Sequence, residues 1–328
     1  MPTRKLRWGL LSTARINRAL IGPLRVSARN ELVAVASRNA AQAEAYAHEW
    51  NIPRAFGSYA AMLADPDIDV IFNPLPNGLH AEWTIKAAQA GKHVLCEKPL
   101  AVSVEEVDAM ASAAAQAGVI VAEAFMYRHH PQPLKVKELV EQGAVGELRW
   151  VRGAFTFNLD HPDDVRLDPA LGGGSIWDVG CYPISYAHTM IGMEPIEAFG
   201  WQVTGPTGVD ETFVGQLRFP GEVYAQFSCS FRAPYRTHIE IVGSEGTISI
   251  PRPFRPDADE HVYLTRGDET QTLTLPGQEP YLGEVEDLAD AVLLGKTPRI
   301  SLADSRGNVA AIVALLRSAR ERVPISLA

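Results

Sequence analysis

The stretch HVLCEKPL, residues 93–100, joins an apolar run to a carboxylate, an ammonium group and a proline ring. The apolar run predicts a buried strand, and a buried strand needs none of the three groups that follow it. Around this stretch, residues 4–123 alternate short apolar runs with amphipathic segments. Strands and helices that alternate at this spacing form right-handed crossovers and a parallel sheet covered on both faces.

The elements of this first half follow from the apolar pattern. Strands are expected at 6–11, 31–37, 70–75, 93–97 and 119–125, and helices at 14–26, 39–50, 79–90, 103–117 and 131–142. Ligands of an open parallel sheet bind at the carboxyl ends of its strands. Glu97 and Lys98 follow one such strand, so the opening stretch ends where a ligand is expected.

The second half has a different rhythm, in which apolar and polar residues alternate with a period of two. Strands are expected at 147–159, 196–204, 211–219, 222–231, 237–243 and 246–250, followed by helices at about 280–294 and 303–321. Short turns such as Pro220-Gly221 join neighbouring strands, which makes these strands mostly antiparallel. The chain is therefore α/β, with a parallel-sheet domain followed by an α+β domain.

Length and composition indicate an ordinary globular protein of two domains. The chain has 328 residues, of which 46% are hydrophobic, and a net charge of −9, which disfavours non-specific nucleic-acid binding. Three widely separated cysteines form no CxxC pair, which favours a reduced, cytoplasmic protein. The basic start followed by a short apolar run is interpreted as a first strand, and no apolar run reaches membrane-spanning length.

The first strand-to-helix turn reads Ser12-Thr13-Ala14-Arg15-Ile16-Asn17. In the dinucleotide pattern G-x-G-x-x-G, glycines would stand at Ser12, Ala14 and Asn17, and all three are replaced. Ala14 is small enough to let a pyrophosphate approach, the helix N-terminus presents free N–H groups, and Ser12 and Thr13 add hydroxyls. An ordinary turn with small residues is the alternative. We expect residues 12–16 to contact the cofactor.

The second strand ends in Ser37-Arg38-Asn39, without the carboxylate that holds the ribose 2′-hydroxyl of NAD. A guanidinium at Arg38 would pair with a 2′-phosphate and stack on adenine, and Ser37 would add a hydrogen bond. The pattern favours NADP, and a solvated arginine at a helix start is the alternative. Further along, Pro74, Leu75, Asn77 and His80 are expected to form a stiff shelf beneath the nicotinamide ribose. The alternatives are that Asn77 simply caps a helix and that His80 is a surface residue in its first turn.

Three segments together resemble the Gfo/Idh/MocA oxidoreductase family: AGKHVLCEKPL (90–100), EAFMYRHHPQ (123–132) and GGGSIWDVGCYPI (172–184). The resemblance covers essentially the whole chain. It implies a Rossmann domain at residues 1–125 and a substrate-binding and dimerisation domain at 126–328 with an open, mostly antiparallel sheet. The final helices could pack back on the first domain. Members of the family oxidise or reduce sugars, cyclitols and related diols with NAD(P).

The resemblance implies that Lys98 is catalytic, that the Lys98–Pro99 peptide is cis, and that Glu97 lies beside the nicotinamide ribose. Many members carry D-x-G-x-H, whereas here Asp178-Val179-Gly180-Cys181-Tyr182 places Tyr182 at the acid/base position. This is similar to the branch of glucose–fructose oxidoreductase, dimeric dihydrodiol dehydrogenase and NADP-dependent xylose dehydrogenases. A tyrosine phenol has an ordinary pKa of about 10, and a nearby ammonium favours the phenolate. Lys98 would supply that charge.

In the expected mechanism a substrate hydroxyl lies between Tyr182, which takes its proton, and Lys98, which stabilises the alkoxide. Asp178 orients either the substrate hydroxyls or the lysine. Weaker candidates for contact with cofactor or substrate are Arg128, Arg166 and Asp168, together with Phe155, Phe157, Trp177 and Tyr281, for which a packing role is the alternative. His129 and His130 lack further ligands at useful spacing, so no metal site is expected.

The sequence thus favours an NADP-dependent oxidoreductase acting on a sugar, with C1 of an aldose as the favoured position. The alternatives are a ketoreductase acting on a nucleotide-linked keto-sugar, a trans-dihydrodiol dehydrogenase, and a non-catalytic NADP(H)-binding regulator. The loops at about 158–172 and 251–261 would separate the enzymatic alternatives, and Arg252 and Arg255 keep the nucleotide-sugar alternative open. A homodimer through the C-terminal sheet, or a larger assembly built on it, is expected because that sheet has apolar residues on both faces.

Overall fold

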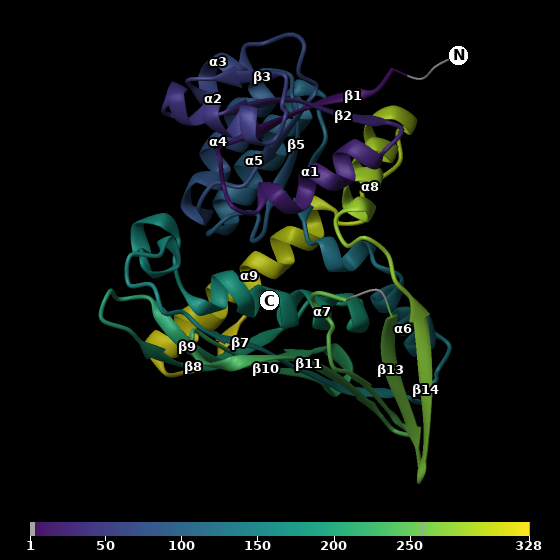
Figure 1. Ribbon diagram of the computed structural model, residues 1–328. Coiled ribbons are helices and arrows are strands. Elements are labelled where there is room, and N and C mark those ends of the chain that lie inside the picture. The colour runs from purple at the N-terminus through teal and green to yellow at the C-terminus, as the bar shows by residue number, and fades with distance from the viewer. Residues whose placement is uncertain (1–3, 257–258, 328) are drawn as a thin grey trace. The chain divides into compact units, whose positions relative to one another are not determined.

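A computed structural model describes residues 4–256 and 259–327 (Figure 1). The chain divides into two compact units. Met1–Met126 and Tyr281–Ser305 form the N-terminal unit, and Tyr127–Pro280 and Arg306–Ala328 form the C-terminal unit. The first of the two closing helices therefore belongs with the N-terminal sheet.

The N-terminal unit is built on a six-stranded parallel sheet in the order β3-β2-β1-β4-β5-β6. Its strands are β1 (Leu6–Leu11), β2 (Asn30–Ala36), β3 (Arg54–Phe56), β4 (Val70–Asn73), β5 (His93–Glu97) and β6 (Val121–Ala124). Its helices are α1 (Asn17–Val26), α2 (Ala40–Glu49), α3 (Tyr59–Leu63), the 3₁₀ turn η1 (Asn77–Leu79), α4 (His80–Gln89), α5 (Val104–Ala117) and α8 (Leu282–Leu294). The predicted Rossmann-type sheet is confirmed.

Local sequence explains where these helices begin and end. Ser103 caps α5 by accepting a hydrogen bond from the Glu106 N–H at 3.2 Å, and the Glu106 carboxylate accepts the Val102 N–H at 3.0 Å. The helix ends at Gly118, whose φ of 66° suits a residue without a Cβ. Helix α8 is tied to the start of β2 by Arg29, whose Nε lies 2.8 Å from Glu286 Oε2.

The C-terminal unit contains a nine-stranded sheet in the order β14-β13-β12-β11-β7-β10-β9-β8-β15. Its strands are β7 (Leu148–Asn158), β8 (Glu197–Thr204), β9 (Asp210–Phe219), β10 (Val223–Ser230), β11 (Arg232–Gly243), β12 (Thr247–Ile250), β13 (Asp259–Arg266), β14 (Glu269–Pro276) and β15 (Ile325–Ser326). All neighbours are antiparallel except β7 and β10. The expected open, mostly antiparallel sheet is confirmed.

One face of this sheet packs against helices. The helical elements are η2 (Met126–His129), α6 (Pro131–Glu141), η3 (Val165–Leu167), η4 (Pro169–Leu171), the π-helix η5 (Ile176–Gly180), α7 (Cys181–Ile191), η6 (Pro220–Glu222) and α9 (Leu302–Glu321). Helix α7 lies against β7 and β10 (Figure 1). Along β10, Val223, Ala225 and Phe227 are buried while Tyr224 is 41% exposed, so the opposite face is open to solvent among the described residues.

Three features of the fold differ from the sequence-based expectations. Helix α1 begins at Asn17 because Ala14–Ile16 form its entry turn. The short strand β3 was not predicted. The hairpin of β13 and β14 was also missed, and it takes up the end of the predicted loop 251–261, in which residues 257–258 lie outside the described part.

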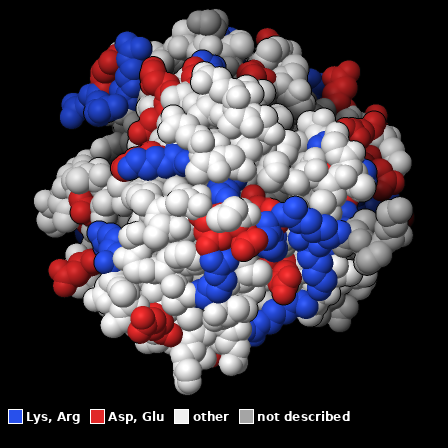
Figure 2. Space-filling model, turned by 90° about the horizontal axis from the view of Figure 1, so that it is seen from above, with Lys and Arg blue, Asp and Glu red and all other residues white. Residues whose placement is uncertain are grey.

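Acidic and basic side chains are mixed on the surface. Figure 2 shows basic and acidic side chains interspersed among uncharged ones on the face seen from above. One ion pair of the N-terminal unit joins Arg7 and Asp69, with 2.9 Å between Arg7 Nε and Asp69 Oδ2. Every helix in the described part of the chain is too short or too polar to cross a bilayer.

Candidate active site

The turn after β5 is held in place by two buried side chains from neighbouring elements. The Lys98–Pro99 peptide is cis, as the family resemblance implied. The Leu100 N–H donates to Glu123 Oε1 of β6 at 2.8 Å, and the Pro99 carbonyl lies 2.8 Å from His80 Nδ1. Glu97 and Lys98 are half-buried. The backbone that carries Lys98 is therefore fixed from both sides.

His80 joins this turn to the loop after β4. Its Nε2 lies 2.6 Å from the Leu75 carbonyl, and the ring is fully buried. Burial lowers the pKa of His80 to about 4, the positive charge of Lys98 acts in the same direction, and the two carbonyls oppose it. At that pKa the ring is neutral at pH 7, so only one nitrogen donates and the other faces its carbonyl oxygen without a hydrogen. A contact between His80 and cofactor stays a prediction, and the ring itself clamps two loops.

The first strand-to-helix turn keeps a backbone conformation that favours glycine. Ser12 has a φ of 101°, and its carbonyl accepts a hydrogen bond from Asn17 Nδ2 at 2.7 Å. The Ser12 hydroxyl accepts the Ala14 N–H at 3.2 Å. Thr13, Ala14 and Ile16 are half-buried and Arg15 is exposed. The turn thus has the shape and the small side chain at Ala14 that a pyrophosphate needs, although its glycines are replaced.

At the end of β2, Ser37 is buried and Arg38 is exposed. The Ser37 hydroxyl donates to Gln42 at 3.1 Å and accepts the Asn39 N–H at 3.2 Å, so it is engaged in holding the start of α2. Arg38 lies close enough to Tyr59 for its charge to oppose the burial that raises the pKa of that phenol. A guanidinium without a neighbouring carboxylate in this turn fits a 2′-phosphate.

In the C-terminal unit, the π-helix and α7 form one continuous helix that carries Trp177, Asp178 and Tyr182. The Tyr182 ring is 8% exposed. Its centroid lies 5.3 Å from Phe155, 5.3 Å from Phe254 and 5.9 Å from Tyr127. Aromatic contacts at these distances are favourable and restrict the ring. The phenol is therefore held in a single orientation by packing.

Asp178 is engaged by Arg166, which brings together two residues predicted to contact substrate. Arg166 Nε lies 2.7 Å from Asp178 Oδ2, and Arg166 Nη1 lies 3.2 Å from Asp164 Oδ1. The charge of Asp178, followed by that of Asp164, raises the pKa of Arg166. The arginine remains 42% exposed, so the pair forms a charged group at the surface of the unit rather than a core ion pair.

Comparison with known proteins identifies this arrangement. The model of the oxidoreductase family with an NAD-binding Rossmann fold matches residues 6–125, and the GFO/IDH/MocA C-terminal domain matches residues 134–249. The chain belongs to the Gfo/Idh/MocA family of oxidoreductases.

Named relatives of this Gfo/Idh/MocA protein act on different substrates. The chain is 39% identical to a D-xylose 1-dehydrogenase (NADP(+)) of Haloferax volcanii, over 98% of this chain and 100% of that protein. It is 34% identical to a trans-1,2-dihydrobenzene-1,2-diol dehydrogenase of Danio rerio, over 98% and 97%. A 3-ketoreductase from Actinomadura kijaniata, solved with NADP and TDP-benzene, superposes with a TM-score of 0.91 at 29% identity, over 96% and 98%. The protein is an NAD(P)-dependent oxidoreductase.

The other residues of this Gfo/Idh/MocA oxidoreductase that were predicted to contact cofactor or substrate lie in several different elements. Phe157 packs on Phe231 at 5.3 Å, and Asp168 caps the turn at Ala170 through an N–H contact of 2.8 Å. Arg128 is buried in η2, Trp177 is buried in the π-helix, and Tyr281 is buried just before α8. Pro74 and Leu75 are buried, while Asn77 begins η1. Contact of each with cofactor or substrate stays a prediction.

The paired histidines are placed by packing. His130 caps α6, since its Nδ1 accepts the Gln132 N–H at 3.1 Å, and burial lowers its pKa. His129 is buried as well. Over the described ranges 4–256 and 259–327, no group of three His, Cys, Asp or Glu side chains is arranged to bind a metal ion.

Sequence reasoning missed the residues that hold the site. Glu123 carried a signal, because a carboxylate inside the apolar run VIVAEAF is out of place in a buried strand. Phe254 carried none, because it stands in a loop that could not be folded from sequence. Lys98 lies in the N-terminal unit and Tyr182 in the C-terminal unit, so their meeting stays a prediction.

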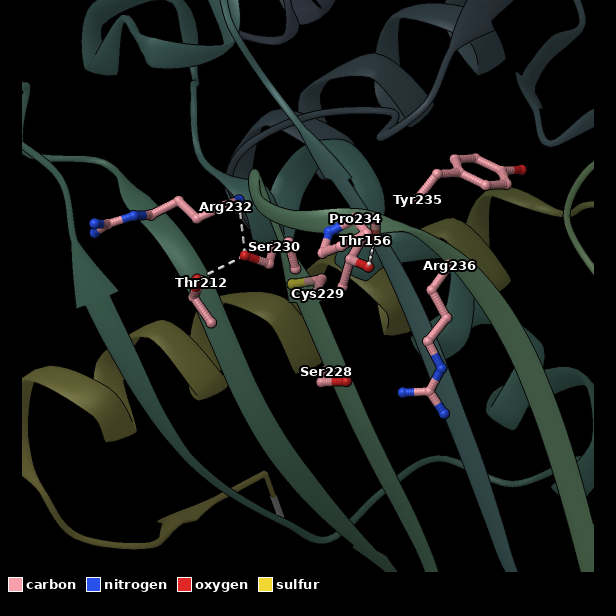
Figure 3. A pocket seen from close by; sticks show the side chains of 10 residues that line it. Thr156, Thr212, Ser228, Cys229, Ser230, Arg232, Pro234, Tyr235 and Arg236 are labelled. Carbon is pink, nitrogen blue, oxygen red and sulfur yellow. Dashed lines mark hydrogen bonds between the residues drawn. The ribbon is translucent and has the colours of Figure 1, made fainter.

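A separate cavity of about 590 Å³ lies over β9, β10, β7 and the start of β11 (Figure 3). Thr156 lines it, whereas the neighbouring Phe155 packs on Tyr182, and successive residues of a strand face opposite sides. Three of the hydroxyls that line it have hydrogen-bond partners within the protein: Thr212 and Ser230 pair with each other at 2.7 Å, and Thr156 donates to the Pro234 carbonyl at 2.6 Å. The cavity is on the sheet face away from Tyr182.

Proposed function

We propose that this protein is an NADP-dependent sugar oxidoreductase that transfers hydride between a sugar carbon, C1 of an aldose in the favoured case, and nicotinamide. The observation that carries the proposal is Tyr182. Its phenol stands at the acid/base position of the family motif and is held by three aromatic rings, with Asp178 one helical turn before it. Such preorganisation suits a group that must exchange one proton at a defined point.

Tyr182, Lys98, Asp178 and Arg166 have different roles in the proposed reaction. Tyr182 takes the proton of the substrate hydroxyl, and the positive charge of Lys98 favours the phenolate form and stabilises the developing alkoxide. Asp178 and Arg166 offer an acceptor and donors to the other hydroxyls of a polyol, and their 2.7 Å ion pair keeps both side chains in place. In the reverse direction Tyr182 returns the proton to the carbonyl oxygen.

The N-terminal unit would hold NADP through the turn at Ser12–Ile16, the guanidinium of Arg38 and the backbone near Leu75. Bound NADP supplies the hydride acceptor or donor. Glu97, Lys98 and Asn77 would surround the nicotinamide ribose. The exposed position of Arg38 favours NADP over NAD, because a ribose 2′-hydroxyl gains nothing from a cation that a 2′-phosphate would pair with.

A substrate screen tests the proposal and its alternatives. Turnover of NADP+ with aldoses would support it, whereas activity confined to nucleotide-linked keto-sugars or to trans-dihydrodiols would assign the chain to the chemistry of its ketoreductase or diol dehydrogenase relatives. NADPH binding, measured by fluorescence, without turnover of any of these substrates would favour a non-catalytic regulator.

Two variants test the catalytic assignment. Lys98→Ala and Tyr182→Phe should each lower kcat by at least ~100-fold, which is the low end for loss of a general acid–base group, while NADPH still binds. Tyr224→Phe is the matched control, since it loses the same hydroxyl on the open face of the sheet. Full activity in either catalytic variant would remove that residue from the mechanism.

Arg38→Ala tests the cofactor assignment. The variant should weaken NADP+ much more than NAD+, because only NADP+ loses a charge-assisted contact. Arg25→Ala is the control, since it removes the same charge from the last turn of α1. Equal losses for the two cofactors would refute the assignment.

We also propose that two copies pair through the open face of the C-terminal sheet. Trp201 (56% exposed) and Val214 (48% exposed) are cross-strand partners there, and Tyr224 and Trp150 extend the apolar surface. Val214→Lys should shift the mass measured by light scattering toward the monomer, and Val26→Lys, an exposed site on α1, should not. An unchanged mass for Val214→Lys would argue against this interface.

A further inference from the structure

The helix that carries Asp178 and Tyr182 begins without a cap from its own chain segment. Ser175, at its N-cap, makes no side-chain hydrogen bond to the following backbone. The first residue of β9, Asp210, caps the helix instead, from a position 34 residues after Ile176. Asp210 Oδ2 accepts the Ile176 N–H at 2.8 Å and the Ser175 hydroxyl at 2.6 Å. A carboxylate at this point satisfies N–H groups that the first turn of any helix leaves open.

The surroundings of Asp210 leave little room for another arrangement. The side chain is 4% exposed. Gly174 has a φ of 128°, and a Cβ there would overlap Asp210 Oδ1. On the next strand, the Cys229 thiol lies 3.5 Å from the Ser175 hydroxyl and would be 2.9 Å from a Cβ at Gly180. The two glycines thus allow the helix start to lie against Asp210 and Cys229.

The first turn of this helix is a π-helix, from Ile176 to Gly180. A π turn places successive side chains at a different angle from an α turn, and such turns occur frequently at functional sites. The Asp178 N–H bonds to the Gly174 carbonyl at 3.1 Å, so the turn is anchored where Asp210 holds it. Asp178 and Tyr182 lie two and six residues after Ile176, the first residue of this turn. Their directions depend on the register of this turn.

Burial raises the pKa of Asp210 to about 6, and the hydrogen bonds from Ser175 and Ile176 oppose the rise. Among the described residues, the titratable group beside Asp210 is the thiol of Cys229. Burial raises the pKa of that thiol, and Cys181 lies next to it. The adjacent Glu211 pairs with Arg232 at 3.5 Å. Asp210 therefore changes charge near pH 6.

We propose that Asp210 is a positioning residue: its carboxylate sets the π-helical turn at Ile176–Gly180 and thereby aims Asp178 and Tyr182 at the substrate. The inference rests on the proposed function for the roles of Asp178 and Tyr182. The structural link between Asp210 and the turn does not depend on the proposed function, so the link and the function can fail separately.

The kinetic test compares three variants of the full chain. Asp210→Ala should lower kcat by about 10- to 100-fold with an unchanged KM for NADP+, because small misplacement of reacting groups costs up to ~100-fold. Asp210→Asn, which keeps one acceptor oxygen, should recover part of that loss, and its kcat should lose the wild-type inflection near the pKa of Asp210. Gly174→Ala should resemble Asp210→Ala, and the double variant should be no worse than either single one.

Asp287→Asn is the matched control. Asp287 on α8 is a partly buried carboxylate whose pKa burial raises, and it accepts the Arg299 N–H at 2.9 Å. The same chemical change there should leave kcat unaltered. Wild-type kcat in Asp210→Ala, or an equal fall in Asp287→Asn, would overturn the proposal.

Hydrogen exchange gives a readout that needs no activity. Amides in peptides spanning residues 174–186 should exchange faster in Asp210→Ala than in wild type, while peptides from β12 and β13 stay unchanged. If no substrate is turned over, the proposed function fails and this measurement alone decides the structural link. Unchanged exchange in 174–186 would refute the role of Asp210 even if the enzyme were active.

Discussion

Replacing His80 with glutamine should make the N-terminal unit less sensitive to acid. The imidazole is fully buried between the Pro99 and Leu75 carbonyls, and its pKa is lowered from 6.5 to about 4. The unfolded chain therefore binds a proton between about pH 6.5 and pH 4 that the folded chain does not. Stability contributed by the neutral ring is present above pH 6.5 and is lost as the pH falls toward 4.

The magnitude follows from the size of the shift. One pKa unit corresponds to about 1.4 kcal/mol, so the full loss is about 3 kcal/mol. Between pH 7.5 and pH 5 the same linkage gives a loss of about 2 kcal/mol. Glutamine cannot titrate and should remove this slope. The variant should be less stable than wild type at pH 7.5, because one carbonyl loses its donor and the packing is imperfect.

The assay is urea unfolding at pH 7.5 and pH 5, followed by hydrogen exchange in peptides from β4 and β5. A local probe is needed because a chain of two units need not unfold in one step. His48→Gln, at an exposed position on α2, is the control and should behave as wild type. If wild type and His80→Gln lose the same free energy between the two pH values, the ring is not neutral. The two carbonyls would then stabilise an imidazolium against burial.

Two further predictions concern the described thiols and the first turn. Cys96, Cys181 and Cys229 are buried, and burial raises the pKa of Cys96 and Cys229. A disulfide reagent should therefore titrate the three thiols only after the protein is unfolded. Rapid reaction of the native protein would contradict the burial. Ser12→Ala keeps the φ of 101° and removes the hydroxyl that accepts the Ala14 N–H, so it should lower the free energy of unfolding by about 1 kcal/mol in the same urea assay. Ser12→Gly should lower it by less, because glycine adopts this φ without backbone strain.

The type and order of most elements could be predicted because each buries one apolar face. The hairpin of β13 and β14 was not predicted. Most described residues of β14 are exposed, so that strand buries little of a face, whereas the alternation of buried Val262 and Leu264 in β13 was overlooked. Strand β3 has three residues, too few to show a period. Helix boundaries were within a few residues where Ser, Asn or Gly marks them, as at Ser103 and Gly118.

The candidate site follows from the sequence only where the family motifs carry it, and the roles of its residues stay predictions. Lys98, Asp178 and Tyr182 stand within those motifs, and the pairing of Arg166 with Asp178 joins two residues named independently. The side chains that hold these groups were not predictable. Glu123 and Asp210 act through hydrogen bonds to segments 23 and 34 positions away in the chain, and such pairings depend on the tertiary fold.

The two turns that carry the proposed catalytic groups are both held by buried titratable side chains, and these titrate with opposite effects on stability. His80 loses about 3 kcal/mol of stabilisation as the pH falls from 6.5 to 4. Asp210, whose pKa is raised from 3.8 to about 6, is harder to ionise when folded, so its contribution falls by about 3 kcal/mol as the pH rises through the same range. A global measurement would therefore show a nearly flat pH profile from these two groups. Because His80 lies in the N-terminal unit and Asp210 in the C-terminal unit, hydrogen exchange resolved by unit should reveal two slopes of opposite sign, and His80→Gln and Asp210→Asn should each abolish only one of them.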